Sequence, residues 1–262
     1  MTTMAPARPS YAFQDSMTML RRNLKHALRY PSLTIGTIGV PVIFLLLFAG
    51  VFGSALGVGI GGVDYIDYLA PGIILMAATS GSIGTAVSVS MDMTEGIINR
   101  FRTMAISRTA VLTGHVVGSV IQTMISIVAV VAVALAMGFR PTATFLEWLA
   151  VAGLLVMLIF ALTWISAALG LVAKGPEAAS NAPLPFTFLP LLGSGFVPTE
   201  TMPAGVRWFA EHQPFTPIIE TLRGLLMGTP IGNNGWLAVG WCVAIALAGY
   251  LWARSAFQRV KA

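Results

Sequence analysis

Six stretches of this chain each run for more than twenty residues without a single Asp, Glu, Lys or Arg. A helix needs about 20 consecutive apolar residues to cross the hydrocarbon core of a bilayer. Only 10% of the residues are charged, against roughly 25% in an ordinary soluble domain. The sequence therefore predicts an all-α integral membrane protein with six transmembrane helices. The six uncharged runs are Tyr30–Val63, Tyr68–Met91, Thr109–Phe139, Trp148–Ala173, Ala178–Thr199 and Gly224–Ala253.

The fifth run differs from the others because it contains Pro183, Pro185 and Pro190. Proline has no backbone N–H and its ring clashes with the preceding turn of a helix. We expect the helix to be interrupted at these positions. Around the runs, the chain divides into a cytoplasmic N-terminus at residues 1–30, a six-span membrane domain at residues 31–253, and a basic cytoplasmic tail at residues 254–262.

The basic residues are unevenly shared between the two sides that six spans define. With the N-terminus in the cytoplasm, the inner segments carry 12 of the 15 Lys and Arg residues, and the outer segments carry six of the ten acidic residues. The positive-inside rule favours this orientation. We expect a multi-pass protein of the cell membrane with both termini in the cytoplasm. The net charge of +5 then reflects membrane orientation and not binding to nucleic acid.

The N-terminal segment has the pattern of an amphipathic helix with a basic face. An apolar stripe recurs at helical spacing, beside a cluster of cations. Such a helix is suited to lie in the cytoplasmic headgroup layer and contact lipid, where it sets topology; contact with a partner protein is a compatible alternative. The residues of this predicted interface helix are Phe13, Met17, Leu20, Arg21, Arg22, Leu24, Lys25 and Arg29.

A charged island lies between the second and third runs. Asp92 and Glu95 precede Arg100, Arg102 and Arg108, which is the order of charges that favours a helix dipole. Asp92 is placed to cap a short helix, with Glu95 reaching back to the cap. The apolar face of this helix consists of Ile97, Phe101 and Met104. An apolar ridge surrounded by guanidinium groups is suited to docking against a protein.

A second polar segment, at residues 198–228, follows the fifth run. It is too polar to cross a bilayer, and its prolines divide it into short helices that lie at the outer interface or re-enter the membrane. Glu220 and Arg223 are three residues apart, which on a helix brings them close enough to form an ion pair.

Several chemistries lack their usual sequence signals. The chain has no Gly-x-x-x-x-Gly-Lys-Ser/Thr motif for nucleotide phosphates, its three histidines are scattered, and it has one cysteine, so we expect no nucleotide and no metal bound by this chain. A lipid-modifying membrane enzyme would need a convergent cluster of catalytic residues. An ion-coupled carrier usually keeps an ionisable group at membrane depth. The uncharged runs weaken the carrier alternative without removing it.

Motifs in the inner loop and along most of the chain match one family of transport proteins. The inner-loop motif consists of Asp92, Gly96, Arg100-Phe101-Arg102, Ile106-Ser107-Arg108 and Gly114. Supporting motifs are Arg21-Arg22-Asn23-Leu24, Arg29-Tyr30-Pro31, Phe52-Gly53, Gln213-Pro214-Phe215-Thr216, and Arg223 with Gly228. In these residues the chain resembles the membrane subunits of ABC-2 type exporters, and within them the daunorubicin-resistance-like permeases of actinobacteria.

The resemblance implies a half-transporter that works as a homodimer with two copies of a separate ABC ATPase, which binds ATP and Mg²⁺. The charged island, about residues 91–108, would be the coupling helix seated in a groove of that ATPase. The transported compound would be a hydrophobic drug, antibiotic or lipid-like molecule, with polysaccharide or lipid-linked glycan as an alternative. The ATPase-coupling residues are then Asp92, Glu95, Gly96, Arg100, Phe101, Arg102, Ile106, Ser107 and Arg108. The candidate residues of the outer segment are Pro214, Thr216, Glu220 and Arg223.

Overall fold

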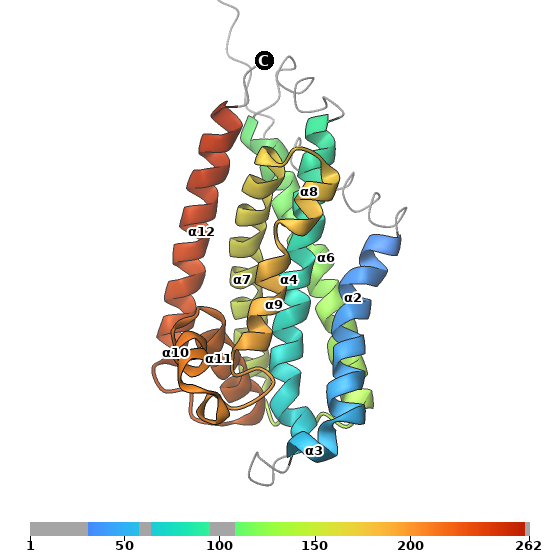
Figure 1. Cartoon of the computed structure of the whole chain (residues 1–262), viewed down its shortest axis with the longest axis vertical. Coiled ribbons are helices and arrows are strands. Elements are labelled where there is room, and N and C mark those ends of the chain that lie inside the picture. Colours follow the sequence, from blue (N-terminus) through green and yellow to red (C-terminus); the bar gives the residue numbers. More distant parts are fainter. Residues whose placement is uncertain (1–30, 58–63, 95–107, 260–262) are drawn as a thin grey trace, which may run out of the picture.

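Four long helices stand side by side in a bundle and dominate the fold (Figure 1). The computed structural model describes residues 31–57, 64–94 and 108–259, and every regular element in these ranges is a helix. The long helices are α4 (Tyr65–Thr94), α6 (Arg108–Ala136), α7 (Phe145–Val172) and α12 (Asn234–Arg259). Within the described ranges, these four contain the segments that are long and apolar enough to cross a membrane. The prediction of an all-helical protein is confirmed.

The four helices agree with four of the six uncharged runs, with shifts at their ends. The second, third and fourth runs correspond to α4, α6 and α7. The sixth run begins at Gly224, but its helix, α12, begins at Asn234. Gly224 instead belongs to α11 (Phe215–Met227), which ends at Gly228 in the left-handed conformation. A residue with positive φ ends a helix, and a count of charges does not detect it.

The first and fifth runs form shorter pieces. The first contains α2 (Pro31–Leu45), the π-helical turn η1 (Leu46–Val51) and α3 (Gly53–Gly57). The fifth contains most of α8 (Pro176–Asn181), which begins two residues before the run, and all of α9 (Leu184–Phe188) and the 3-10 turn η2 (Leu189–Leu192). Prolines stand at or next to the start of α8, α9 and η2. Because proline cannot donate to the preceding turn, the fifth run is divided at the positions that its prolines predict.

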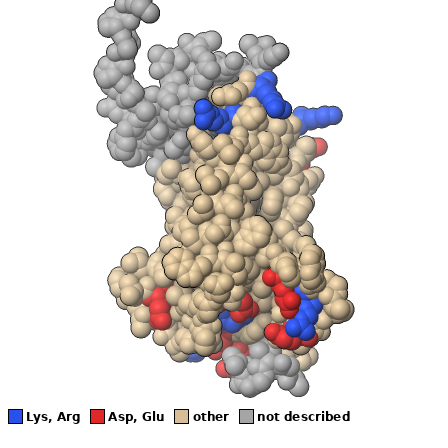
Figure 2. Space-filling view, turned by 90° about the vertical axis from the view of Figure 1, so that its left-hand side faces the viewer, with Lys and Arg blue, Asp and Glu red and all other residues tan. Residues whose placement is uncertain are grey.

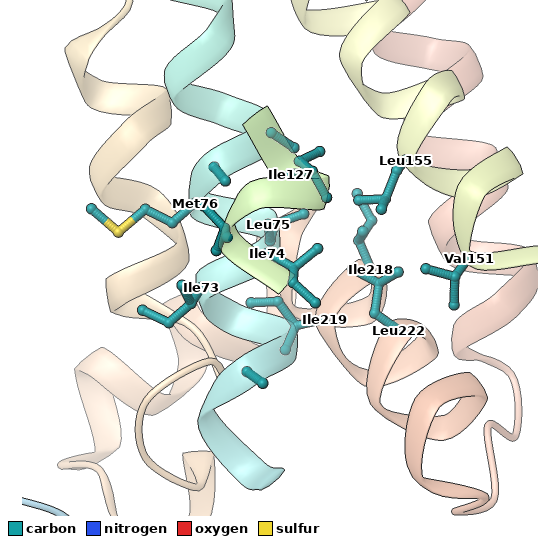
Figure 3. Packing of buried hydrophobic residues seen from close by; sticks show 14 of the residues in the cluster. Ile73, Ile74, Leu75, Met76, Ile127, Val151, Leu155, Ile218, Ile219 and Leu222 are labelled. Carbon is teal, nitrogen blue, oxygen red and sulfur yellow. The ribbon is translucent and has the colours of Figure 1, made fainter. Parts of the chain in front are cut away.

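α4 is the central helix, and its residues from Leu69 to Ser80 are buried. α7, α6, α2 and the broken α8–α9 segment all pack against it. Figure 3 shows the core on one side of α4, where Ile74 and Leu75 approach Ile127 of α6 and Ile218 of α11. Lipid tails are as apolar as these side chains, so close van der Waals packing, more than removal from water, holds such a core together.

The remaining elements gather at one end of the bundle, which we call the α11 end. They are η3 (Thr199–Thr201), α10 (Ala204–His212) and α11, and α3 lies at the same end (Figure 1). The last residues of α4 and α12 lie at the opposite end. Figure 2 shows most of the acidic side chains near the α11 end, with some basic ones among them, and mainly basic side chains at the opposite end. The described basic side chains at the opposite end are Lys174, Arg254 and Arg259.

The start of α7 is fixed by a capping box. Thr144 Oγ1 accepts the Glu147 N–H, while the Glu147 carboxylate accepts the Thr144 N–H at 2.6 Å and its hydroxyl at 2.8 Å. We expect Thr144→Ala to lower the free energy of unfolding by about 1 kcal/mol, the usual cost of losing an N-cap hydroxyl. Thr144→Ser keeps the hydroxyl and should leave stability unchanged. Thermal unfolding of the purified protein measures both, and equal melting temperatures for the two variants would contradict the role of the cap.

Candidate functional site

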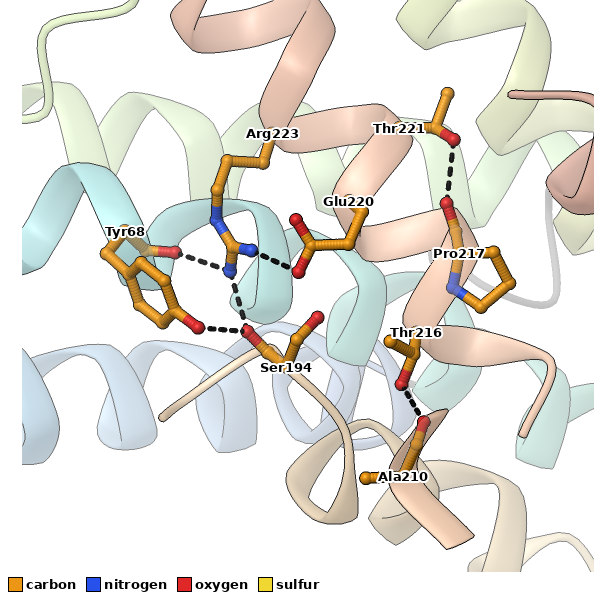
Figure 4. A network of polar contacts seen from close by, with 8 residues as sticks. All are labelled: Tyr68, Ser194, Ala210, Thr216, Pro217, Glu220, Thr221 and Arg223. Atoms are coloured by element: carbon orange, nitrogen blue, oxygen red, sulfur yellow. Dashed lines mark hydrogen bonds and ion pairs between the residues drawn. The ribbon is translucent and has the colours of Figure 1, made fainter. Parts of the chain in front are cut away.

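Arg223 of α11 lies at the centre of a buried network at the α11 end (Figure 4). Its Nη1 donates to Glu220 Oε1 at 2.6 Å, and its Nη2 donates to the carbonyl oxygens of Ser194 at 2.7 Å and Tyr68 at 3.2 Å. The guanidinium carbon lies 3.9 Å from the centre of the Tyr68 ring, within the range of a cation–π contact. Arg223 is only 8% exposed. One cation therefore joins α11 to the start of α4 and to the turn after η2.

The turn after η2 is held from α4 as well. Tyr68 Oη donates to the Ser194 carbonyl at 2.9 Å, and Tyr65 Oη donates to the Phe196 carbonyl at 3.0 Å. The Ser194 carbonyl thus accepts from both Tyr68 and Arg223. A carbonyl oxygen has two lone pairs, so both hydrogen bonds can form together. The Ser194 carbonyl oxygen therefore connects α4, α11 and the turn after η2, which are far apart in the sequence.

The helices α10 and α11 meet in a tight corner. Pro214 is the N-cap residue of α11, and the Thr216 hydroxyl donates back to the carbonyl of Ala210 in α10. This bond fixes the angle between the two helices. On the exposed side of α10, Arg207 donates to Glu211 at 2.8 Å, and hydrogen bonding to this carboxylate raises the pKa of the Arg207 guanidinium.

α10 also presents apolar side chains to its surroundings. Trp208 is 63% exposed and stacks on His212 with ring centres 4.7 Å apart. Tryptophan is typical of the boundary between lipid and water. The position of α10 at one end of the bundle, with an exposed tryptophan, fits a helix that lies at that boundary.

The outer residues predicted from the sequence come together only in part. The ion pair expected from the spacing of Glu220 and Arg223 is confirmed. Pro214 and Thr216 lie at the start of the same helix and fix its corner with α10. Sequence reasoning missed the roles of Tyr68 and Ser194.

The predicted coupling residues are largely outside the described residues. Of this set, the structure describes Asp92 and the backbone of Arg108. Asp92 is buried within α4, so it lies in the last turn of that helix and does not start a new one. Met93 packs against the apolar cluster that contains Val89, so the packing of α4 continues past the uncharged run and the helix extends through Asp92 to Thr94. Arg108 is the first residue of α6. The other coupling residues, Glu95, Gly96, Arg100, Phe101, Arg102, Ile106 and Ser107, and all residues of the predicted interface helix lie outside the described ranges.

Comparison with known proteins decides the family. The model of the ABC-2 type transporter family matches residues 14–227. The chain belongs to the ABC-2 type transporter family. It is 30% identical over 226 residues to the "Daunorubicin resistance ABC transporter permease protein DrrB1" of Streptomyces coeruleorubidus, covering 86% of this chain and 78% of that protein. It is 24% identical over 224 residues to the "Probable doxorubicin resistance ABC transporter permease protein DrrC" of Mycobacterium tuberculosis, covering 81% of this chain and 78% of that protein.

Membership of the ABC-2 family agrees with the long apolar helices of the molecule. ABC-2 proteins are integral membrane permeases that work with an ABC ATPase, and the four apolar helices fit such a protein. The resemblance recognised from the sequence motifs is confirmed by these matches. In this permease, the Arg223 network connects α11 to α4 and to the turn after η2.

Proposed function

We propose that this chain is the membrane subunit of an ATP-binding cassette exporter that moves a hydrophobic drug, antibiotic or lipid-like compound out of a bacterial cell. The observation that carries the proposal is the similarity to the daunorubicin resistance permease over 86% of the chain. A separate ATPase chain would bind ATP and Mg²⁺ and supply the energy. Two copies of this chain and two of the ATPase would form the transporter, since each chain resembles half of a transport unit.

The proposed topology has six crossings. Besides the four long helices, α2 and η1 form a helical stretch from Pro31 to Val51. At 1.5 Å per residue this stretch is roughly 30 Å long, which is close to the thickness of the hydrocarbon core. The broken segment α8–α9–η2 runs alongside α4 from one end of the bundle toward the other (Figure 1). A broken helix can exist at membrane depth where protein covers it, as α4 does here.

The proposed orientation places both termini in the cytoplasm and the α11 end outside. The support is the charge of the described side chains. Lys174, Arg254 and Arg259 are at the end opposite α11, where α4 and α12 finish. The segments at the α11 end include the starts of α4 and α7, with the residues that lead into them, as well as η3, α10 and α11. Together they carry six acidic and three basic residues, which are Asp64, Asp67, Glu147, Glu200, Glu211 and Glu220, and Arg140, Arg207 and Arg223. The positive-inside rule then places the end opposite α11 in the cytoplasm.

The function is tested by purifying the full chain with a co-expressed ABC ATPase and measuring ATP hydrolysis in lipid vesicles. We expect the two proteins to purify together and daunorubicin to change the rate of hydrolysis. Accumulation of daunorubicin in inverted vesicles should then require ATP. Accumulation that follows an ion gradient and ignores ATP would instead identify a secondary carrier. ATP-driven export of a glycan without effect of the drug would overturn the assignment of cargo.

The proposed coupling site yields a separate prediction. Phe101 is proposed to be the apolar anchor of the coupling helix in the ATPase groove. We expect Phe101→Ala to reduce the recovery of ATPase with the purified chain about tenfold, since a buried aromatic anchor at an interface is commonly worth 1.4 kcal/mol or more. Phe145→Ala is the matched control, because Phe145 is 86% exposed and lies at the α11 end. Equal recovery of the ATPase by both variants would exclude the anchor role of Phe101.

A further inference from the structure

Gln213 lies near the Arg223 network and has a buried side-chain amide that takes no part in it. It stands at the corner between α10 and α11, and its backbone N–H donates to Phe209, which closes α10. Its side chain is 5% exposed. Among the described residues, no group donates to its amide oxygen or accepts from its amide nitrogen. A carboxamide can donate two hydrogen bonds and accept two, so all of this capacity is buried and unused.

The Gln213 amide is directed at the turn after η2. A Cβ atom placed on Gly193 would lie 2.7 Å from Gln213 Nε2 and 2.9 Å from Thr216 Oγ1. The carboxamide therefore lies against the backbone of Gly193, in space that a side chain would otherwise fill. Gly193 leads directly into Ser194, whose carbonyl joins the Arg223 network (Figure 4).

Two further polar atoms on this turn and on α11 are also left over. Ser194 is 3% exposed, and its hydroxyl has no partner among the described residues. The Nε of Arg223 is likewise without a partner among them, although both of its terminal nitrogens donate. Thr216 donates to Ala210 but keeps lone pairs that can accept. The Gln213 amide and Thr216 lie beside Gly193, Arg223 contacts the Ser194 carbonyl, and Ser194 has a hydroxyl of its own, so polar groups with unused capacity gather at this turn.

Burial of such groups without partners is unfavourable. The large majority of buried side-chain polar atoms in proteins have a hydrogen-bond partner from protein or ordered water. The side chains here offer both donors and acceptors, and the cation of Arg223 is already matched by Glu220. The complementary partner is a small neutral group that donates and accepts at once. A hydroxyl has that chemistry, whereas a metal ion or a second anion does not.

We propose that Gln213 and the turn at Gly193 and Ser194 form a binding site for a hydroxyl group. The hydroxyl belongs to an ordered water molecule or to an alcohol group of the transported compound. If the hydroxyl belongs to the transported compound, the site is part of the substrate pathway and rests on the proposed function. If it belongs to a water molecule, the site does not depend on transport. The site lies beside the Arg223 network. A bound hydroxyl would therefore also stabilise the contact between α4, α11 and the turn after η2.

The first experiment measures the melting temperature of the purified full chain in lipid without any drug. Gln213→Met keeps the length of the side chain and removes its polar atoms. If the amide binds a hydroxyl, the melting temperature should fall by roughly 3 °C or more. Gln258→Met makes the same chemical change at an exposed position near the end of α12 and should have no effect. An unbound amide predicts the reverse, because removing an unpaired buried amide raises stability.

A high-resolution structure of the wild-type chain provides the second measurement, since it does not depend on a variant that folds. Density should lie within about 2.7–3.2 Å of the Gln213 amide nitrogen or oxygen. A melting temperature of Gln213→Met at or above that of wild type, together with empty density at the amide, would overturn the site.

Daunorubicin distinguishes the two sources of the hydroxyl. Its affinity for the chain is measured with wild type, Gln213→Met and Gln258→Met. A loss of about tenfold in Gln213→Met alone would assign the hydroxyl to the transported compound. Unchanged affinity, with the lower melting temperature, would assign it to water. Failure of daunorubicin to bind any of the three proteins would overturn the assignment to this drug, while the melting temperature would still decide whether the site exists.

Discussion

Replacing Arg223 with alanine is expected to lower the free energy of unfolding by on the order of 3 kcal/mol. The change removes an almost fully buried cation that bonds to Glu220 and to two backbone carbonyls. The Glu220 side chain, which is 32% exposed, would lose its counter-ion, and the Tyr68 carbonyl would lose a donor. Breaking this pair from one side is costly because about two thirds of the Glu220 side chain stays buried without its counter-ion.

The chain offers a matched control for this prediction in α10. Arg207 and Glu211 also form an ion pair, at 2.8 Å, but their side chains are 46% and 41% exposed. Water and salt screen such a pair, so Arg207→Ala should leave stability nearly unchanged. Arg223→Lys should fall between the two, because lysine retains the charge but not the planar fork that reaches three acceptors.

Chemical or thermal unfolding of the purified variants in the same lipid or detergent measures these differences. The network is expected to matter most for the attachment of α11, so limited proteolysis should cut Arg223→Ala first near the α10–α11 corner. If Arg223→Ala and Arg207→Ala unfold at the same temperature, the Arg223 network does not hold the α11 end together.

The Arg223 network also shows what the sequence could and could not predict. The bond to Glu220 spans three residues on one helix, so local spacing was sufficient to predict it. The bonds to Ser194 and Tyr68 span 29 and 155 residues. No periodicity along the chain connects residues at such distances. They become neighbours only because α4, α11 and the turn after η2 converge at one end of the bundle.

Helix positions were predictable to the extent that they depend on local chemistry. Absence of charge located α4, α6 and α7, and the prolines located the breaks of the fifth run. The start of α12 was misplaced because the turn before it is uncharged. Its signal is Gly228 and Gly232, both with positive φ, on either side of Pro230. Asp92 was expected to begin a helix, but α4 continues through it since helix ends depend on packing as well as on capping residues.

Gly249 is expected to be the least replaceable residue of α12. A Cβ atom placed there would lie 2.7 Å from the backbone nitrogen of Ile165 and 3.1 Å from the carbonyl carbon of Trp164. Backbone atoms of a packed helix cannot move aside as a flexible side chain can. Small residues commonly allow this close approach between membrane helices, where packing supplies most of the attraction. α12 packs against α7 more extensively than any other pair of helices pack in the described part of the chain.

Gly249→Leu should therefore separate α12 from α7 and lower the free energy of unfolding by on the order of 3 kcal/mol, at the upper end of the usual cost of overpacking. Gly240→Leu is the control, because Gly240 is on the same helix, is exposed, and has no atom within 4 Å of its added Cβ. That control should change stability by less than about 1 kcal/mol, the difference in helix propensity. Melting temperature and the protease resistance of α12 in lipid measure both variants. If Gly249→Leu is as stable as the wild type, the contact between α12 and α7 is loose enough to accept a leucine side chain. In that case the surrounding lipid, more than α7, holds α12 in place.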